Sequence, residues 1–437
     1  MDLTDDEIYK TVVNILQPLV LSNEDYASIM NRMLDAMVRG LNLKTRESSS
    51  IKMYPSFVTR FPTGKEKGQF LALDLGGTNY RVLLVTLAGG VHPKIDERTY
   101  AIPKEKMVGT GQDLFGYIAS TLQNFLKRYN LVDTPLPLGF TFSFPCEQHA
   151  LDKSILVRWT KGFNVHDAVN ADVCKLLQDA TDGLKVKCVA VVNDTVGTLA
   201  SCALEDPSCA IGLIVGTGTN AAYIEKIETC EFMKKLESEK PVYRPKEEDS
   251  VVINMEWGAF GEEGELETYL TEFDLELDNA SLHPGKQVFE KMISGMYLGE
   301  LVRIILVHLV KRQLLFRGEM PEVLTKPCSF LTKFVTETER DPSHLFYSTH
   351  SVLTEDLEIP IVDHIDDRVV RIVCEAVSKR AAYLAGAGIA ACMHRLNRRK
   401  VTIGIDGSLY KFHPRFRERM TDIIDKLKPE GVQVSFI

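Results

Sequence analysis

Two glycine-rich loops, near residues 74 and 216, contain the residue types that bind phosphate. The first reads Asp74-Leu75-Gly76-Gly77-Thr78-Asn79 and is followed by Arg81. Adjacent glycines let backbone N–H groups approach a phosphate closely, Thr78 and Asn79 add donors, and Arg81 adds positive charge. The carboxylate of Asp74 suits Mg²⁺, bound directly or through water. Glycine also serves an ordinary hairpin turn, so the local string leaves phosphate binding and a simple turn open.

The second loop, Gly216-Thr217-Gly218-Thr219-Asn220, ends a buried strand predicted at 211–215. With Ala221 it also matches the dinucleotide fingerprint G-x-G-x-x-G/A, which requires a helix to begin there. Residues 221–225 read instead as a strand, so a phosphate-facing hairpin loop is favoured over a nicotinamide site. No Walker A string occurs, which excludes the P-loop class.

A polar pair, Asn193-Asp194, follows the apolar run at 188–192, which predicts a strand covered on both faces. Open α/β sheets bind ligands at the carboxyl ends of their strands, so this position favours a ligand contact. The alternative is an N-cap, which Asp also favours, for a helix that begins near Thr195. The two roles are compatible, because helix N–H groups would keep the carboxylate ionised and oriented.

Further polar side chains are of the kind that bind sugar hydroxyls. Glu256 precedes Trp257 and Glu290 follows Phe289. Carboxylates and Asn amides accept from or donate to vicinal hydroxyl groups. Each carboxylate could instead be a surface ion-pair partner, and Lys161, alone in a polar loop, could simply be solvated.

These residues lie on a predicted α/β framework, because strands alternate with helices. The strands at 70–73 and 80–85 form a hairpin, and Asp113 is a candidate N-cap for the helix that follows it. Long helical patterns fill roughly 286–316 and 363–396. The likeness of the regions near 74 and 216 predicts a duplicated core with a cleft between its halves.

Composition narrows the function classes. The 437 residues carry a formal net charge of −9, which leaves no electrostatic basis for binding nucleic acid or an anionic membrane. No apolar run approaches the ~18 residues of a transmembrane helix, and the N-terminus is acidic, unlike a signal or transit peptide. Nine scattered cysteines without a C-x-x-C pair predict reduced thiols in a cytoplasmic protein.

Taken together, the strings resemble the motifs of the hexokinase family, in the same order and over nearly the whole chain. Residues 73–81 resemble its first phosphate motif, 141–146 its sugar-binding signature, 159–163 a segment just downstream, 192–198 the segment of the catalytic base, 216–220 the second phosphate motif and 405–410 the adenosine motif. Residues 254–258 and 289–295 also match.

The resemblance implies an actin-like ATPase fold, that is, a duplicated ribonuclease H-like fold with two domains around a cleft. The small domain would be 61–193, and the large domain 1–60 with 194–437. The implied reaction transfers the γ-phosphoryl group of MgATP to the 6-hydroxyl of glucose or a related hexose. Sugar binding would close the cleft and exclude water, with a hinge near 60–70 and 193–197. Partners would be hexoses, with ATP and Mg²⁺ as cofactors.

The likeness also implies residue roles. Asp194 would be the general base, and Lys161 and Arg81 would face the transferring phosphoryl group. The sugar would be held by Ser143, Thr160, Lys161, Asn193, Asp194, Asn220, Glu256 and Glu290. The nucleotide side would comprise Asp74 (also the Mg²⁺ contact, through water), Gly76, Gly77, Thr78, Asn79, Arg81, Thr217, Gly218, Gly295, Thr332, Lys333, Asp406, Gly407 and Ser408. Thr332 and Lys333 rest on a looser match.

The family continues past a strand like 432–437 with a Gly-rich segment and a last helix, so contacts from that segment stay unassigned. A non-catalytic sugar sensor or a chaperone-type ATPase could use the same fold. A chaperone-type ATPase has no need of the residues predicted to hold the sugar, and a non-catalytic sensor is expected to lose Asp194. Both alternatives are therefore disfavoured. A dehydrogenase is disfavoured by the strand after Gly218.

Overall fold

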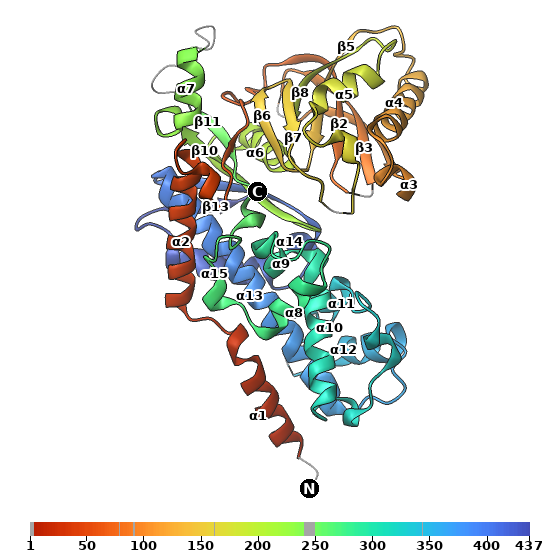
Figure 1. Ribbon diagram of the computed structural model, residues 1–437, viewed down its shortest axis with the longest axis vertical. Helices are drawn as coiled ribbons and strands as arrows, with labels where there is room; N and C mark the ends of the chain where they lie inside the picture. The colour runs from red at the N-terminus through yellow and green to blue at the C-terminus, as the bar shows by residue number, and fades with distance from the viewer. Residues whose placement is uncertain (1–3, 78, 91, 161, 240–249, 343) are drawn as a thin grey trace.

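The computed structural model describes residues 4–77, 79–90, 92–160, 162–239, 250–342 and 344–437, with the chain arranged in two lobes (Figure 1). Each lobe is built around one β-sheet and has its own cluster of buried apolar side chains. The first cluster draws its members from 71–191, and the second from 12–57 together with 196–432. The predicted α/β class is therefore confirmed.

The first lobe contains a five-stranded sheet in the order β4-β3-β2-β5-β8. Strands β2 and β3 form the predicted hairpin, in which Asp74 lies opposite Arg81. Strand β5 runs parallel to β2, and β8 runs parallel to β5. The strands are β2 (Lys67–Leu75), β3 (Asn79–Ala88), β4 (Lys94–Ala101), β5 (Leu136–Phe142) and β8 (Val186–Val192), with a separate hairpin of β6 (Cys146–Ala150) and β7 (Lys153–Leu156).

The second lobe contains a six-stranded sheet in the order β1-β11-β10-β9-β12-β13. Apart from β1, its order and strand directions repeat those of the first sheet: two antiparallel pairs are followed by two parallel ones. This repetition confirms the predicted duplicated core. The strands are β1 (Tyr54–Pro55), β9 (Cys209–Val215), β10 (Thr219–Lys226), β11 (Ser250–Asn254), β12 (Lys400–Asp406) and β13 (Gln433–Phe436).

The longest helix of the second lobe, α13 (His364–Leu396), is buried on most of its surface and packs against α2 and α15. Its many alanines and glycines allow neighbouring helices to approach closely, as at Gly386, where a Cβ would lie 2.3 Å from Ile423. The other helices are α1 (Asp5–Leu16), α2 (Asn23–Leu41), α3 (Lys104–Met107), α4 (Gly111–Arg128), α5 (Val173–Ala180), α6 (Asp194–Glu205), α7 (Glu231–Glu239), α8 (Glu272–Ala280), α9 (Val288–Ile293), α10 (Gly295–Lys311), α11 (Thr332–Thr338), α12 (Tyr347–Ser351), α14 (Ser408–Phe412) and α15 (Phe416–Leu427).

Three local predictions are wrong, each for a physical reason. The N-cap of α4 is Thr110, whose hydroxyl accepts from Asp113 N–H while the Asp113 carboxylate accepts from Thr110 N–H. The helical pattern at 286–316 breaks at Ser294, between α9 and α10. Strand β8 is not covered on both faces, because buried and more exposed side chains alternate along it and its Val189 is 39% exposed.

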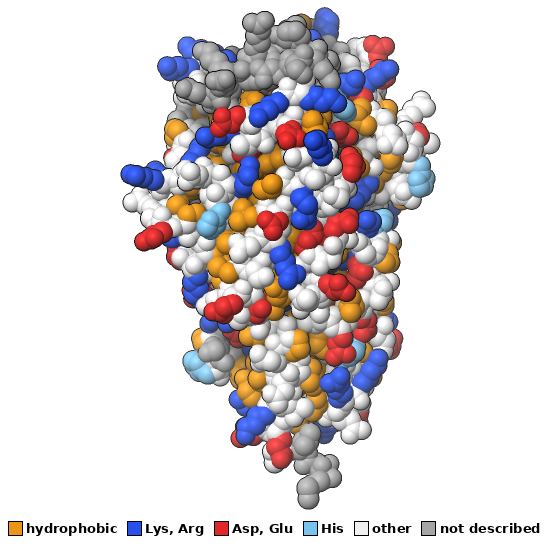
Figure 2. Space-filling model, turned by 60° about the vertical axis from the view of Figure 1, so that its left-hand side comes forward, with side chains coloured by type: hydrophobic (Ala, Val, Ile, Leu, Met, Phe, Trp, Pro, Cys, Tyr) orange, Lys and Arg blue, Asp and Glu red, His pale blue; other side chains and the backbone are white. Residues whose placement is uncertain are grey.

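On the face that Figure 2 shows, acidic and basic side chains are interspersed, with hydrophobic side chains scattered between them. This face carries no broad patch of one sign. Among the helices of the described ranges, none combines the length and the apolar character that crossing a bilayer requires.

Candidate active site

Asp194 is the first residue of α6, directly beyond the end of β8. The N-cap is Asn193, whose Oδ1 accepts hydrogen bonds from Thr195 N (3.0 Å) and Thr195 Oγ1 (2.7 Å). Asp194 Oδ1 accepts from the same N–H at 2.9 Å, and among the described residues no hydrogen bond reaches its Oδ2. The alternative in which Asp194 is itself the cap is therefore wrong, and one carboxylate oxygen remains for a ligand.

Asp194 lines a cavity between the two lobes that encloses about 400 Å³ of atom-free space, part of it open to solvent. The walls come from the ends of strands in both sheets and from the loops beyond them. All sugar-side residues predicted from the sequence, apart from Lys161, lie on these walls; Lys161 is outside the described residues. The lining is Ser143, Pro145, Thr160, Asn193, Asp194, Ile214, Gly218, Thr219, Asn220, Glu256, Gln287 and Glu290.

A network of amides and a carboxylate fixes the large-lobe wall of this cavity. The amide Nδ2 of Asn220 lies 2.7 Å from Asn254 Oδ1, 3.3 Å from Glu256 Oε1 and 3.3 Å from Asn193 Oδ1. Asn254 Nδ2 donates to Glu256 Oε1 at 2.8 Å. Such mutual bonds hold each side chain in one rotamer before a ligand arrives, which reduces the entropy lost on binding.

Backbone strain gathers at the same wall. Glu256 and Gln287 have left-handed φ angles of 55° and 54°, which are uncommon for residues other than glycine. Glu290 Oε2 accepts from Thr219 N at 3.1 Å, and the Trp257 indole donates to Thr219 Oγ1 at 3.1 Å. These tertiary bonds hold the strained segments in place, a combination that is typical of binding sites.

The opposite wall comes from β5 and the loop at 157–165. Ser143 N–H donates to Leu75 O at 3.1 Å, and Ser143 is 4% exposed. The rings of Phe144, Trp159 and Phe163 pack together, and the Trp159 indole donates to Val165 O at 2.7 Å. This packing fixes the backbone on either side of Thr160, which faces the cavity.

The first glycine-rich loop carries an ion pair across its hairpin. Arg81 Nη2 lies 2.5 Å from Asp74 Oδ2. Burial alone would lower the pKa of Arg81, but the hydrogen bond and the charge of Asp74 outweigh burial and raise it. Gly76, Gly77 and Asn79 form the turn and the start of β3, and Thr78 lies outside the described residues. The turn therefore presents backbone groups beside a fixed cation.

The second glycine-rich loop contacts two further backbone segments. Gly295 N–H donates to Gly216 O at 2.8 Å, and Met296 N–H donates to Thr217 O at 3.1 Å. Gly407, with φ of 126°, comes so close that a Cβ there would lie 2.2 Å from Val215 O. Residues 216–218, 295–296 and 407–408 thus form one assembly at the ends of β9 and β12.

Asp406 faces this assembly from the end of β12 and forms an ion pair with Lys411 at 2.5 Å. Burial would raise the pKa of Asp406, but the hydrogen bond from Lys411 and nearby positive charges, including Arg81, outweigh burial and lower it. Arg81 of the first lobe and Asp406 of the second therefore lie within electrostatic range of each other.

A second cavity opens beside the assembly and encloses about 790 Å³ of atom-free space, part of it open to solvent. Thr332 Oγ1 donates to Gly295 O at 2.6 Å and accepts from Gly299 N–H at 3.0 Å. Lys333 lies in the cavity wall, 3.5 Å from Asp356 Oδ1. The lining is Thr217, Gly295, Met296, Thr332, Lys333, Thr336, Glu337, Arg340, Ser408, Leu409 and Phe412. The structure thus brings the loosely matched Thr332 and Lys333 together with Thr217, Gly295 and Ser408.

Sequence reasoning missed two residues of the sugar-side wall, Thr219 and Gln287, and also Asn254, which bonds to two wall residues. Asn254 is two residues before Glu256, and its amide completes the bond network around Asn220. Gln287 enters the wall through a left-handed backbone that no local pattern indicates. The polar spacing of Asn254 and Glu256 was the one indication that could have identified a member of this group.

The comparisons with known proteins agree with this geometry. Two models, each described as "Hexokinase", match residues 11–204 and 210–437. The chain is 58% identical to the hexokinase of Schistosoma mansoni, over 99% of this chain and 94% of that protein. It is 45% identical to human hexokinase-2, over 97% of this chain and 46% of that longer protein.

Solved structures give the same result. The structure titled hexokinase from Schistosoma mansoni complexed with glucose superposes with a TM-score of 0.94 at 58% identity, and covers 100% of this chain and 96% of that one. Another hexokinase crystal structure gives a TM-score of 0.81 at 32% identity over 99% of this chain and 96% of that one. The fold is the actin-like ATPase fold, and the chain belongs to the hexokinase family.

Proposed function

We propose that this chain, as a hexokinase, transfers the γ-phosphoryl group of MgATP to the 6-hydroxyl of glucose and related hexoses, with Asp194 as general base. The observation that carries the proposal is the position of the Asp194 carboxylate. One oxygen is fixed by Thr195 N–H, and the other is left for a ligand in a cavity lined by amides and carboxylates. A relative 58% identical to this chain was solved in complex with glucose.

The chemistry asks for positioning and charge stabilisation more than for covalent catalysis. Asp194 would accept the proton of the 6-hydroxyl as the new O–P bond forms. Ser143, Thr160, Asn193, Asn220, Glu256 and Glu290 would hold the hydroxyl groups that fix the sugar in line with the phosphoryl donor. Arg81, together with Lys161, would stabilise the charge of the transferring group.

The nucleotide side has the features that MgATP requires. Three glycine-containing segments present backbone groups beside the second cavity, which encloses about 790 Å³ of atom-free space. Asp74 and Asp406 supply carboxylates near the loops. No cluster of three metal-binding side chains occurs in the described part of the chain. Mg²⁺ commonly uses one or two carboxylates, waters and substrate phosphates, so Asp74 acting through water is in keeping with this site.

Sugar binding would close the cleft and exclude water, which would otherwise compete with the sugar for ATP. We divide the chain into a small domain at 61–193 and a large domain at 1–60 and 194–437, with the hinge near 60–70 and 193–197. Two separate apolar clusters support this division. A cytoplasmic location is part of the proposal, supported by nine cysteines that are all free thiols.

The proposal predicts that Asp194→Asn lowers kcat by at least about 10²-fold, because the amide cannot accept the hydroxyl proton. Glucose binding should be retained, since the isosteric amide keeps the shape of the cavity. Kinetics of glucose 6-phosphate formation, with glucose binding followed by tryptophan fluorescence, measure both quantities. Wild-type kcat in this variant would remove Asp194 from the catalytic role.

A further inference from the structure

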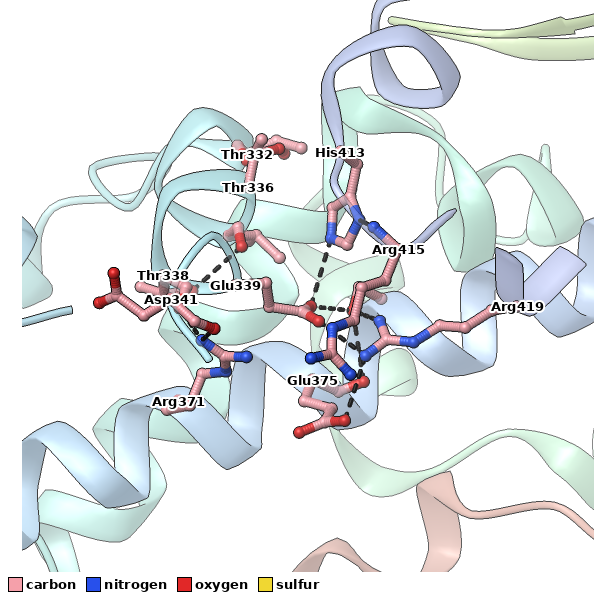
Figure 3. A network of polar contacts seen from close by, with 12 residues as sticks. Thr332, Thr336, Thr338, Glu339, Asp341, Arg371, Glu375, His413, Arg415 and Arg419 are labelled. Carbon is pink, nitrogen blue, oxygen red and sulfur yellow. Dashed lines mark hydrogen bonds and ion pairs between the residues drawn. The ribbon is translucent and has the colours of Figure 1, made fainter. Parts of the chain in front are cut away.

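Beside the second cavity lies a buried polar network (Figure 3), whose central residues, Glu339, His413 and Arg419, line neither cavity. At its centre is Glu339, which is 1% exposed. Its Oε2 lies 2.7 Å from Arg419 Nη2, and its Oε1 lies 3.2 Å from His413 Nε2. Ser378 Oγ also donates to Glu339 Oε1, and Arg419 Nη1 donates to Ser378 Oγ at 2.8 Å. A charged group this deeply buried is costly unless it is paired in this way.

The network joins the ends of the two short helices that wall the cavity. Glu339 is the C-cap of α11, whose first residues, Thr332 and Lys333, line the cavity. His413 is the C-cap of α14, whose first residue, Ser408, lines the same cavity. The bond between Glu339 and His413 therefore connects the two helices at their C-terminal ends, beside Glu337, Arg340 and Phe412, which also line the cavity.

Further contacts hold these ends against the core. The buried guanidinium of Arg371, on α13, donates to Thr338 O and, at 3.2 Å, to Asp341 O. A cation at this end also complements the dipole of α11. Burial would raise the pKa of Glu339, but the hydrogen bond from His413 and the charge of Arg419 outweigh it and lower the pKa to about 2. Glu339 is therefore an anion at neutral pH.

We propose that Glu339 and His413 are positioning residues for the nucleotide: by tying the C-termini of α11 and α14 together, they set the separation of the cavity walls. This inference rests on the proposed function, because it takes the cavity as the nucleotide site. Neither residue touches the ligand. Loosening the tie lets Thr332 and Ser408 move relative to each other, which weakens nucleotide binding and leaves the sugar side unchanged.

Glu339→Gln is the direct test, since it keeps the shape of the side chain and removes its charge. The loss of a charge-assisted hydrogen bond predicts a rise of about tenfold in the KM for ATP. The KM for glucose should stay within about twofold, because the sugar wall shares no bond with this network. His413→Gln, which keeps a donor in place, should raise the KM for ATP less.

A buried ion pair elsewhere in the same lobe separates positioning from general destabilisation. Arg380 contacts Asp274 at 2.6 and 2.7 Å, with both side chains buried and neither in the second cavity. Asp274→Asn should lower the melting temperature about as much as Glu339→Gln, yet leave the KM for ATP unchanged. An equal rise in the KM for ATP in both variants, or no rise in Glu339→Gln, would overturn the proposal.

Calorimetric titration with MgADP gives a readout that does not depend on turnover. Glu339→Gln should weaken MgADP binding by a similar factor, and an unchanged Kd would contradict the positioning role. Failure of the wild-type chain to phosphorylate glucose would count against the proposed function alone. The MgADP titration would still report whether the bond between Glu339 and His413 affects nucleotide binding.

Discussion

The side-chain amide of Asn220 holds the sugar-side wall together. Its Nδ2 contacts Asn254, Glu256 and Asn193, so a single side chain orders three acceptors from two segments of the chain. Removing it leaves Glu256 and Asn254 without a common donor and, in the proposed function, takes one hydroxyl contact from the sugar. The effect should therefore fall on sugar binding more than on the nucleotide.

Asn220→Ala should raise the KM for glucose about tenfold or more and leave the KM for ATP nearly unchanged, as expected for a lost buried hydrogen bond. Steady-state kinetics with each substrate varied in turn measure both values. Asn42→Ala is the matched control, because this amide binds Glu231 at 3.1 Å outside both cavities. Equal rises in both KM values would indicate general misfolding instead.

The sequence indicated candidate site residues where polar side chains follow a predicted strand, as at Asn193-Asp194, or flank a glycine-rich loop, as at Asp74 and Arg81. Gln287 was not, because its place in the wall depends on a left-handed φ that distant contacts hold. The role of Glu339 was equally hidden, since its partners His413 and Arg419 lie 74 and 80 residues away in the sequence.

At the scale of elements, the glycine-rich hairpins were predictable, because apolar strands and turn residues are local features. The break between α9 and α10 was not. The segment 286–316 reads as one helical pattern, but Gly295 N–H bonds to Gly216 O across the site, at 2.8 Å. A tertiary contact thus ends one helix and begins the next, at the point where Gly295 meets the second glycine-rich loop.

The close approach of β12 to β9 gives a prediction for Gly407. An alanine there would combine a φ of 126° with a Cβ 2.2 Å from Val215 O, so the loops must separate. Gly407→Ala should cost at least about 1–3 kcal/mol of stability and raise the KM for ATP. Thermal unfolding and ATP kinetics measure the two effects.

Gly431 supplies the control for Gly407→Ala, because its φ is 77° and nothing lies within 4 Å of a Cβ there. Gly431→Ala should therefore show only the conformational cost, with no change in the KM for ATP. If the two alanines behaved alike, close packing of the loops would not explain the effect.

At the scale of the whole molecule, the duplicated core was predictable from the likeness of two loops, and the common strand order of the two sheets confirms it. The contacts between lobes were not predictable. Arg158 Nη2 lies 3.7 Å from Glu262 Oε1, and Arg46 Nη2 lies 3.7 Å from Glu147 Oε1. Glu262 also accepts from Gln287 N–H at 2.9 Å, which ties this pair to the sugar wall.

If closure follows sugar binding, Arg158→Ala should weaken glucose binding several-fold, because the closed arrangement loses an ion pair. Adding Glu262→Gln to this variant should then reduce glucose affinity less than the same substitution does in the wild-type chain, as a double-mutant cycle would show. Glucose affinity can be measured by fluorescence titration, since one of the two tryptophans, Trp159, directly follows Arg158 in the sequence.

Arg312→Ala removes an ion pair of similar length, 3.8 Å to Glu272, that lies within one lobe. It should leave glucose affinity unchanged. Additive losses from Arg158→Ala and Glu262→Gln, with no coupling between them, would show that this pair does not help to hold the lobes together.

The most direct test of the central claim is the product formed by the purified chain from glucose and ATP with Mg²⁺, followed by ³¹P NMR and a glucose 6-phosphate-specific coupled assay. The account predicts stoichiometric glucose 6-phosphate and ADP, with little ATP hydrolysis when glucose is absent. ATP consumed without a sugar phosphate, or phosphate attached at another hydroxyl, would contradict it.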